Sequence, residues 1–143
     1  LERNVKKIVG VDLSSGMIAQ ARAKFTDPRI KLIKGDVEQA RLEKYDRCVV
    51  YNALPHFENP GRLIRLLSAD ISQDGRLTVA HCESKEKINR RHMHGACEVS
   101  NSLMPATELA ALFEDFFKVD IIVDNDEMYI VSGVLKKQIN KLK

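Results

Sequence analysis

A short apolar segment that runs into an acidic residue, and then into a helical pattern, constrains the fold of this chain most. Residues 8–11 read Ile-Val-Gly-Val, and three of the four are β-branched, as in a strand covered on both faces. Asp12 follows directly, and the helical pattern of residues 15–25 begins within three positions. In open α/β sheets, ligands bind at the carboxyl ends of parallel strands. The segment therefore predicts an α/β fold with an acidic side chain at its ligand-binding edge.

Asp12 has two interpretations. Its two carboxylate oxygens can accept hydrogen bonds from the paired hydroxyls of a ribose. Alternatively, Asp12 or Ser14 is only the N-cap of the following helix and holds free backbone N–H groups. The segment alone does not separate these interpretations, so the rest of the chain has to.

Length and composition limit the class of protein. The 143 residues are 44% hydrophobic and 30% charged, as expected for one globular domain. A net charge of +3, spread along the chain, does not favour nucleic acid as a partner. No apolar stretch reaches membrane-spanning length, and the three cysteines lack disulfide-framework spacing. We therefore expect a cytoplasmic protein with neither nucleic acid nor membrane as a partner.

Strand and helix patterns alternate along the chain with short connections. Helices are expected over residues 15–25, from Asn59-Pro60 to Asp74-Gly75, and from Met104-Pro105 onward, while residues 83–103 are polar and lack clean periodicity. Strands are expected at residues 7–11, 30–34, 48–51, 76–82, 119–123 and 128–135. This order predicts a mostly parallel sheet with an antiparallel hairpin at its C-terminal end.

Three of the expected strands end in residues that can carry chemistry. The first ends in Asp12, the second in Gly35-Asp36, and the third in a segment from Asn52 to His56. Because parallel strands end at the same edge of a sheet, we expect two carboxylates, an amide and an imidazole to line one crevice. A plain turn or helix cap is the competing interpretation of Asp36.

These motifs resemble the class I S-adenosylmethionine-dependent methyltransferases, specifically the ubiquinone/menaquinone-biosynthesis-like group called type 11. The resemblance implies a Rossmann-like three-layer sandwich over residues 1–137, followed by a basic tail at 138–143. It implies that Asp12 binds the ribose, that Met17 packs on the adenine and that Asp36 meets the adenine amine. The cofactor would be S-adenosyl-L-methionine, with S-adenosyl-L-homocysteine as the product. The cofactor-binding residues implied are Asp12, Leu13, Met17, Gly35, Asp36, Val37, Asn52 and Ala53.

One element of that family is absent from the sequence. The family's first strand carries an acidic, glycine-rich loop, whereas Leu1 to Asn4 look like the end of the helix that should follow it. We therefore expect the chain to begin partway through the domain and to lack the central strand of the sheet. Two inner sheet edges would then be unpaired. A homodimer or a strand-swapped assembly is one way to cover them.

The chemistry implied is transfer of a methyl group to a small-molecule acceptor. A general base is needed only if the acceptor must lose a proton, and His56 and His92 are the candidates. A hydrogen-bonded loop residue is the competing interpretation of His56. His92, His94 and Cys97 form a His-x-His-x-x-Cys pattern, but no metal site is predicted because no further ligand pair lies nearby.

Two other functions stay open from the sequence. A dinucleotide-dependent oxidoreductase also places an acidic residue at the end of its second strand. A non-catalytic or truncated fragment that acts by association would account for the missing first strand.

Overall fold

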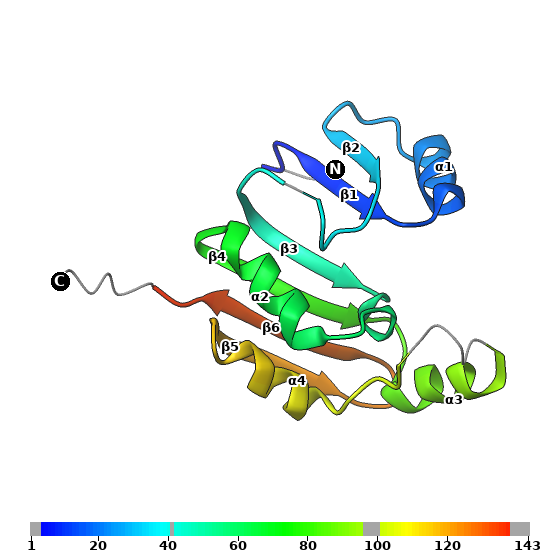
Figure 1. Cartoon of the computed structure of the whole chain (residues 1–143), viewed down its shortest axis with the longest axis vertical. Coiled ribbons are helices and arrows are strands. Elements are labelled where there is room, and N and C mark those ends of the chain that lie inside the picture. The colour runs from blue at the N-terminus through cyan, green and yellow to red at the C-terminus, as the bar shows by residue number, and fades with distance from the viewer. Residues whose placement is uncertain (1–3, 41, 96–100, 138–143) are drawn as a thin grey trace. The chain divides into compact units, whose positions relative to one another are not determined.

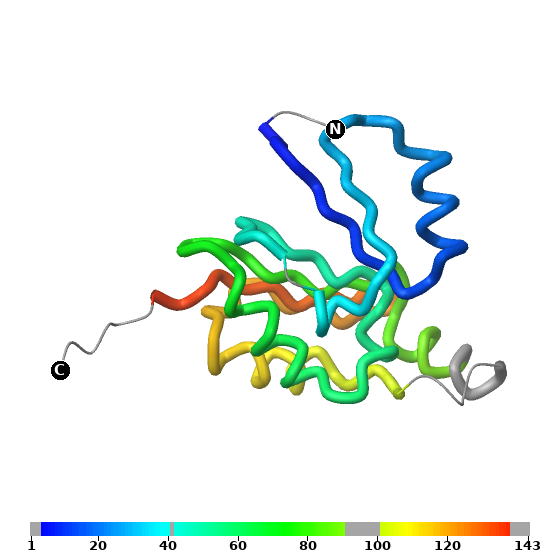
Figure 2. Tube along the Cα trace, turned by 45° about the horizontal axis from the view of Figure 1, so that its top comes forward, coloured from blue at the N-terminus to red at the C-terminus, as the bar shows by residue number. Residues whose placement is uncertain are grey.

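The computed structural model describes residues 4–40, 42–95 and 101–137, with side chains in helix α3 described only up to residue 90. The chain divides into two compact units, residues 1–42 and 43–143. Figures 1 and 2 trace the chain through both.

The first unit is a β-α-β segment. Strand β1 (Ile8–Asp12) leads into helix α1 (Ser15–Lys24), and strand β2 (Ile30–Lys34) pairs with β1 in parallel. The last register pair, Asp12 and Lys34, brings the carboxyl ends of the two strands level. The strand–helix–strand order expected for this part of the chain is confirmed.

The apolar face expected on helix α1 is only partly buried. Ile18 is buried, whereas Met17 is 53% exposed and Phe25 is 49% exposed. Helix α1 ends at Lys24, and Phe25 is its C-cap. The expected helix is confirmed, with Phe25 as its cap rather than its last residue.

The second unit is a four-stranded sheet with helices. Its strand order is β3-β4-β6-β5, with β3 and β4 parallel and the other two pairs antiparallel. The antiparallel hairpin expected at the C-terminal end is confirmed. The elements are strand β3 (Tyr45–Tyr51), the single 3-10 turn η1 (Leu54–His56), helix α2 (Pro60–Asp70), strand β4 (Ile71–His81), helix α3 (Lys85–Gly95), helix α4 (Ala106–Phe113), strand β5 (Phe117–Asp124) and strand β6 (Tyr129–Leu135).

The core of the second unit lies between this sheet and helices α2 and α4. Leu77 and Val79 of β4 and Val131 of β6 are fully buried. Helices α2 and α4 contact each other as well as the strands, and Figure 1 shows both on one face of the sheet. Because this packing holds β4 firmly, the residues at the carboxyl end of β4 have a rigid support.

The connection between helix α2 and strand β4 differs from the expectation. The helix ends at Asp70 rather than at Asp74-Gly75, and β4 begins at Ile71 rather than at Arg76. The ladder jumps from the pair Tyr45–Ile71 to the pair Arg47–Arg76, so β4 bulges between its two paired parts. An apolar residue such as Ile71 fits either pattern, because helix and strand signals overlap in short apolar runs.

The described strands form two sheets rather than one. β1 pairs only with β2 among the described residues, and β3 pairs only with β4. Along the chain, the division between the two units falls after residue 42, between β2 and β3. Among the described helices, none has both the length and the apolarity needed to cross a membrane.

Candidate functional site

Asp12 ends β1 and turns the chain toward helix α1. Its Oδ1 accepts a hydrogen bond from the Ser14 N–H at 2.7 Å. The helix cap itself is Ser14, whose Oγ accepts from the Met17 N–H at 3.2 Å. The capping role therefore belongs to Ser14. The half-buried Asp12 carboxylate keeps acceptor capacity on Oδ2, because each carboxylate oxygen has two lone pairs.

Asp36 lies two residues beyond Lys34, the last residue of the neighbouring strand β2. The Gly35 N–H donates to the Asp12 carbonyl at 3.0 Å, which ties the two strand ends together. The Asp36 Oδ1 accepts from the Glu38 N–H at 2.9 Å, and its Oδ2 accepts from the Gln39 side chain at 3.0 Å. Asp36 therefore stabilises its own turn, as the structural interpretation expects. One lone pair on each oxygen remains for a ligand.

Gly35 is a position where the fold itself does not need a glycine. Its backbone is not left-handed, and a Cβ placed there would meet nothing within 4 Å. Leu13, next to Asp12 at the end of β1, is 69% exposed. Met17 in the first turn of helix α1 is 53% exposed. Val37 follows Asp36 and is half-buried. The first unit thus gathers six of the eight predicted cofactor-binding residues around two adjacent strand ends.

Asn52 directly follows β3 and has a left-handed backbone conformation. Its φ is +51°, in the left-handed region that asparagine tolerates better than most residues. Its Oδ1 accepts from the Cys82 N–H at 3.1 Å, and its Nδ2 donates to the Cys82 Sγ at 3.4 Å. Both ends of the amide are therefore used to join the ends of β3 and β4. A hydrogen bond with the Cys82 thiol also raises the pKa of Tyr51.

His56 lies at the end of turn η1, where its backbone N–H donates to the Ala53 carbonyl at 3.0 Å. The His56 side chain is exposed and lines a cavity of about 270 Å³. The cavity belongs entirely to the second unit. Its lining residues are Asn52, Pro55, His56, His81, Cys82, Glu83 and Ile88. We call this cavity the histidine pocket.

Four residues of the histidine pocket lie outside both the predicted site residues and the expected segment from Asn52 to His56. They are His81, Cys82, Glu83 and Ile88. His81 is buried and packs edge-on against the Tyr129 ring, with centroids 5.7 Å apart. The strand-end rule used for Asp12, Asp36 and Asn52 would have found Cys82 and Glu83, because they end and follow the fourth expected strand. His81 is the last residue of the observed β4. Ile88 could not be found, since helix α3 was not predicted.

Two of the basic side chains after β4 already have polar partners within the chain. Lys85 forms an ion pair with Glu86 at 3.3 Å, and the Lys87 Nζ donates to the Asp126 carbonyl at 3.2 Å. The side chains of His92 and His94 lie outside the described part of helix α3, and Cys97 lies outside the described residues. Within the described part of the chain, no group of three metal-ligating side chains comes together.

The structure brings Asp12 and Gly35-Asp36 together in the first unit, and Asn52, Ala53 and His56 together in the second. The two groups come from separately described units, so the single crevice expected from the sequence stays a prediction. Each group nevertheless lies at the carboxyl ends of parallel strands, where α/β proteins bind ligands.

Comparisons with known proteins agree on one class. The sequence profile of a family described as "Methyltransferase domain" matches residues 1–79. A malonyl-[acyl-carrier protein] O-methyltransferase from Priestia megaterium is 46% identical over 46 residues, a stretch that covers 32% of this chain and 17% of that protein. The chain thus spans only a small part of that relative.

Two solved structures show the same fold, which confirms the expected Rossmann-like class. An S-adenosylmethionine-dependent methyltransferase from Mesorhizobium loti has a TM-score of 0.73 at 18% identity, over 90% of this chain and 80% of that one. The N-methyltransferase NodS from Bradyrhizobium japonicum, solved with S-adenosyl-L-homocysteine, has a TM-score of 0.66 at 12% identity, over 92% and 68%.

Proposed function

The chain belongs to the methyltransferase domain family, and from this premise we propose that it binds S-adenosylmethionine and transfers the methyl group to a small-molecule acceptor. One observation carries the cofactor part of this proposal. Two half-buried carboxylates, Asp12 and Asp36, lie at adjacent parallel strand ends beside a glycine that the backbone does not require. A flat ligand with hydroxyl and amine donors fits that combination.

Asp12 would accept hydrogen bonds from the ribose hydroxyls, mainly through Oδ2, because Oδ1 already accepts from Ser14. Asp36 would accept from the exocyclic amine of the adenine. The open space beside Gly35 would allow the adenine ring to approach the backbone. The exposed Leu13 and Met17 side chains would then cover apolar parts of the nucleoside.

Asn52 and Ala53 would contribute to the methionine end of the cofactor. Because the Asn52 amide is bonded at both ends to Cys82, its side chain would position this segment rather than bind the ligand. The main chain of residues 52 and 53 would make the contact. This division of roles differs from that of Asp12, whose side chain itself would bind.

When bound, S-adenosylmethionine supplies a methyl group on a sulfonium, which is an excellent leaving group. The protein then mainly has to align the acceptor and exclude water. The histidine pocket would hold the acceptor, and its volume of about 270 Å³ fits a small molecule or the reactive end of a larger one. His56 would accept the proton that a nitrogen or oxygen acceptor releases on attack.

Calorimetric titration of S-adenosyl-L-homocysteine into the protein expressed from its complete gene tests cofactor binding. Asp12→Asn and Asp36→Asn should each weaken binding about 10- to 100-fold, because a hydrogen bond to a charged group contributes about 1.5–3 kcal/mol. The exposed Asp115 is the matched control, and Asp115→Asn should not change affinity. No binding by the unsubstituted protein would overturn the proposal, and binding of NADH instead would favour an oxidoreductase.

A panel of small-molecule acceptors tests the transfer itself. The panel should contain amines, phenols, carboxylic acids and a malonyl thioester, the last because of the matched stretch of the Priestia enzyme. His56→Gln should lower kcat about 100-fold. If His56→Gln leaves kcat unchanged while His92→Gln lowers it, the base is His92.

A further inference from the structure

The histidine pocket has two walls that come from separate segments of the chain. Pro55 and His56 on turn η1 form one wall, and Ile88 on helix α3 forms part of the other. The first wall follows β3, and the second follows β4. A pocket built in this way keeps a fixed width only if something ties the two segments together.

Residues 101–104, here called the strap, are bonded to the first wall. The Asn101 backbone N–H donates to the Pro55 carbonyl at 2.8 Å. The Asn101 side-chain Nδ2 donates to the Phe57 carbonyl at 3.2 Å. These two bonds hold the carbonyl groups of the two residues that flank His56 in the chain.

The strap is also bonded to helix α3. The Asn89 Oδ1 accepts from the Leu103 N–H at 2.6 Å, and the Asn89 Nδ2 donates to the Leu103 carbonyl at 3.0 Å. The Asn89 side chain therefore bonds to both the backbone N–H and the backbone carbonyl of Leu103. A residue of a neighbouring β-strand would make the same two bonds. Leu103 is only 3% exposed, which fixes the strap in place. Asn89 is the residue next to Ile88.

We propose that Asn89 and Asn101 are positioning residues that set the width of the histidine pocket, and so decide which acceptors it admits. The assignment of the pocket to the acceptor rests on the proposed function. Neither asparagine lines the pocket. Each acts through another residue: Asn101 through the backbone around His56, and Asn89 through the attachment of helix α3, which carries Ile88.

The two asparagines are separate from the bonds that hold the sheet. Asn101 is exposed and Asn89 is half-buried, and both bond to backbone groups, namely those of Pro55, Phe57 and Leu103. Their loss should therefore loosen the pocket more than it loosens the core. That difference can be measured, because the chain has one thiol in the pocket and another in the sheet.

Cys82 lies in the pocket and is exposed, whereas burial raises the pKa of the Cys48 thiol in β3 to about 11. Alkylation by iodoacetamide, followed by mass spectrometry of the separate cysteine peptides, reports on both. Asn89→Ala and Asn101→Ala should each change the Cys82 rate at least fivefold and leave the Cys48 rate unchanged. Ser102→Ala, an exposed strap residue, is the matched control and should leave both rates unchanged.

A kinetic split completes the test, using the acceptor that the panel identifies. Asn101→Ala should raise KM for that acceptor about tenfold and change KM for S-adenosylmethionine less than twofold. Asn89→Asp keeps the bond accepted from the Leu103 N–H, so it should change KM for the acceptor less than Asn89→Ala does. Equal changes in both KM values, or parallel changes in Cys82 and Cys48 labelling, would overturn the proposal. If the unsubstituted protein does not bind S-adenosyl-L-homocysteine, the proposed function is overturned instead.

Discussion

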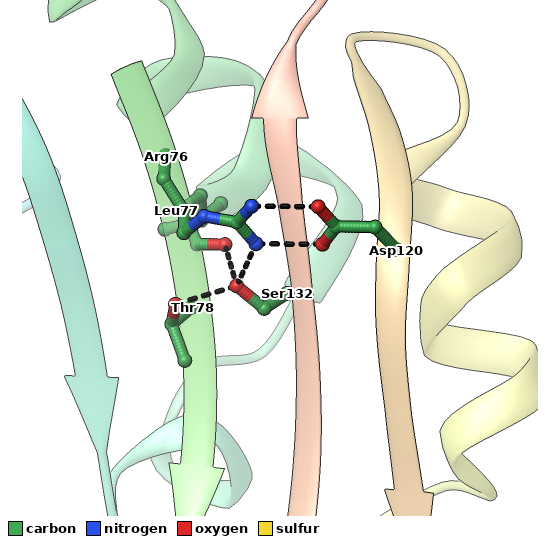
Figure 3. A network of polar contacts seen from close by, with 5 residues as sticks. All are labelled: Arg76, Leu77, Thr78, Asp120 and Ser132. Carbon is green, nitrogen blue, oxygen red and sulfur yellow. Dashed lines mark hydrogen bonds and ion pairs between the residues drawn. The ribbon is translucent and has the colours of Figure 1, made fainter. Parts of the chain in front are cut away.

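Arg76 on β4 and Asp120 on β5 form a two-point ion pair across β6 (Figure 3). The Arg76 Nη1 and Nη2 lie 2.6 Å from the Asp120 Oδ1 and Oδ2, respectively. The pair ties the edge strand of the hairpin to a central strand. It also lowers the pKa of Asp120, first through the hydrogen bonds from Arg76.

Ser132 on β6 connects this pair to the sheet below it. Its Oγ accepts from the Arg76 Nη1 at 3.0 Å and donates to the Leu77 carbonyl at 3.2 Å (Figure 3). The Thr78 hydroxyl lies 2.7 Å away and completes the hydrogen bonding of Ser132. The buried Ser132 hydroxyl therefore has all of its hydrogen-bonding capacity satisfied.

Substitution of Ser132 tests the value of that junction. Ser132 is 1% exposed, so Ser132→Ala removes its three hydrogen bonds, with Arg76, Leu77 and Thr78, from a buried position. The free energy of unfolding should fall by about 1–3 kcal/mol, measured by urea denaturation. Ser102→Ala, at an exposed position, should change it by less than about 0.5 kcal/mol. Equal stability of the two variants would mean that water replaces the Ser132 hydroxyl.

Acid should weaken the first unit through Asp27. Hydrogen bonds from the Arg29 side chain and backbone lower the pKa of Asp27 from 3.8 to about 2. Because the folded-state pKa is below the unfolded one, the contribution is complete above pH 3.8 and is lost as the pH falls toward about 2. Asp27→Asn should make the fall in stability over this window shallower, as followed by NMR of β2 amides. An unchanged slope would contradict the role assigned to the pair.

Gly75 shows where the fold does need a glycine. A Cβ at this position would lie 2.5 Å from the Ile71 Cγ2, 2.7 Å from the Ser72 carbonyl oxygen and 2.9 Å from the Asp46 carbonyl oxygen. Because two of these atoms are backbone, the strain cannot be relieved by a side-chain rotation. Gly75→Ala should lower the free energy of unfolding by about 1–3 kcal/mol. Gly61→Ala, where the nearest atom would be 3.5 Å away, is the control.

The sequence predicts those elements whose signals are local. β2 was predicted with its observed bounds, residues 30–34. The start of helix α2 was predicted from Asn59-Pro60, and the Asn59 side chain does accept from the Arg62 N–H at 2.9 Å. Asp12 was correctly placed at a strand end. Of the two residues considered as the N-cap of helix α1, Asp12 and Ser14, the cap is Ser14.

What could not be predicted depends on contacts between distant residues. Ser84 directly precedes helix α3, and its Oγ accepts from the Lys87 N–H at 3.3 Å. The helix itself has little apolar periodicity, because Ile88 is its one core residue among those with described side chains. The bulge before Gly75 is set by the pairing of β4 with β3. The strap is held by bonds between residues far apart in the sequence. Asn89 and Leu103 are 14 positions apart, and Asn101 and Phe57 are 44 positions apart.

Gly35→Ala separates the needs of the fold from those of the ligand. The added Cβ would enter open space on a backbone that is not left-handed, so stability should stay equal or rise by up to about 1 kcal/mol. If the adenine lies against this backbone, the same methyl group should weaken S-adenosyl-L-homocysteine binding at least tenfold in calorimetry. Gly61→Ala again serves as the control and should bind normally. Full affinity in Gly35→Ala would remove Gly35 from the cofactor site, and lost affinity together with lost stability would assign the residue to the fold.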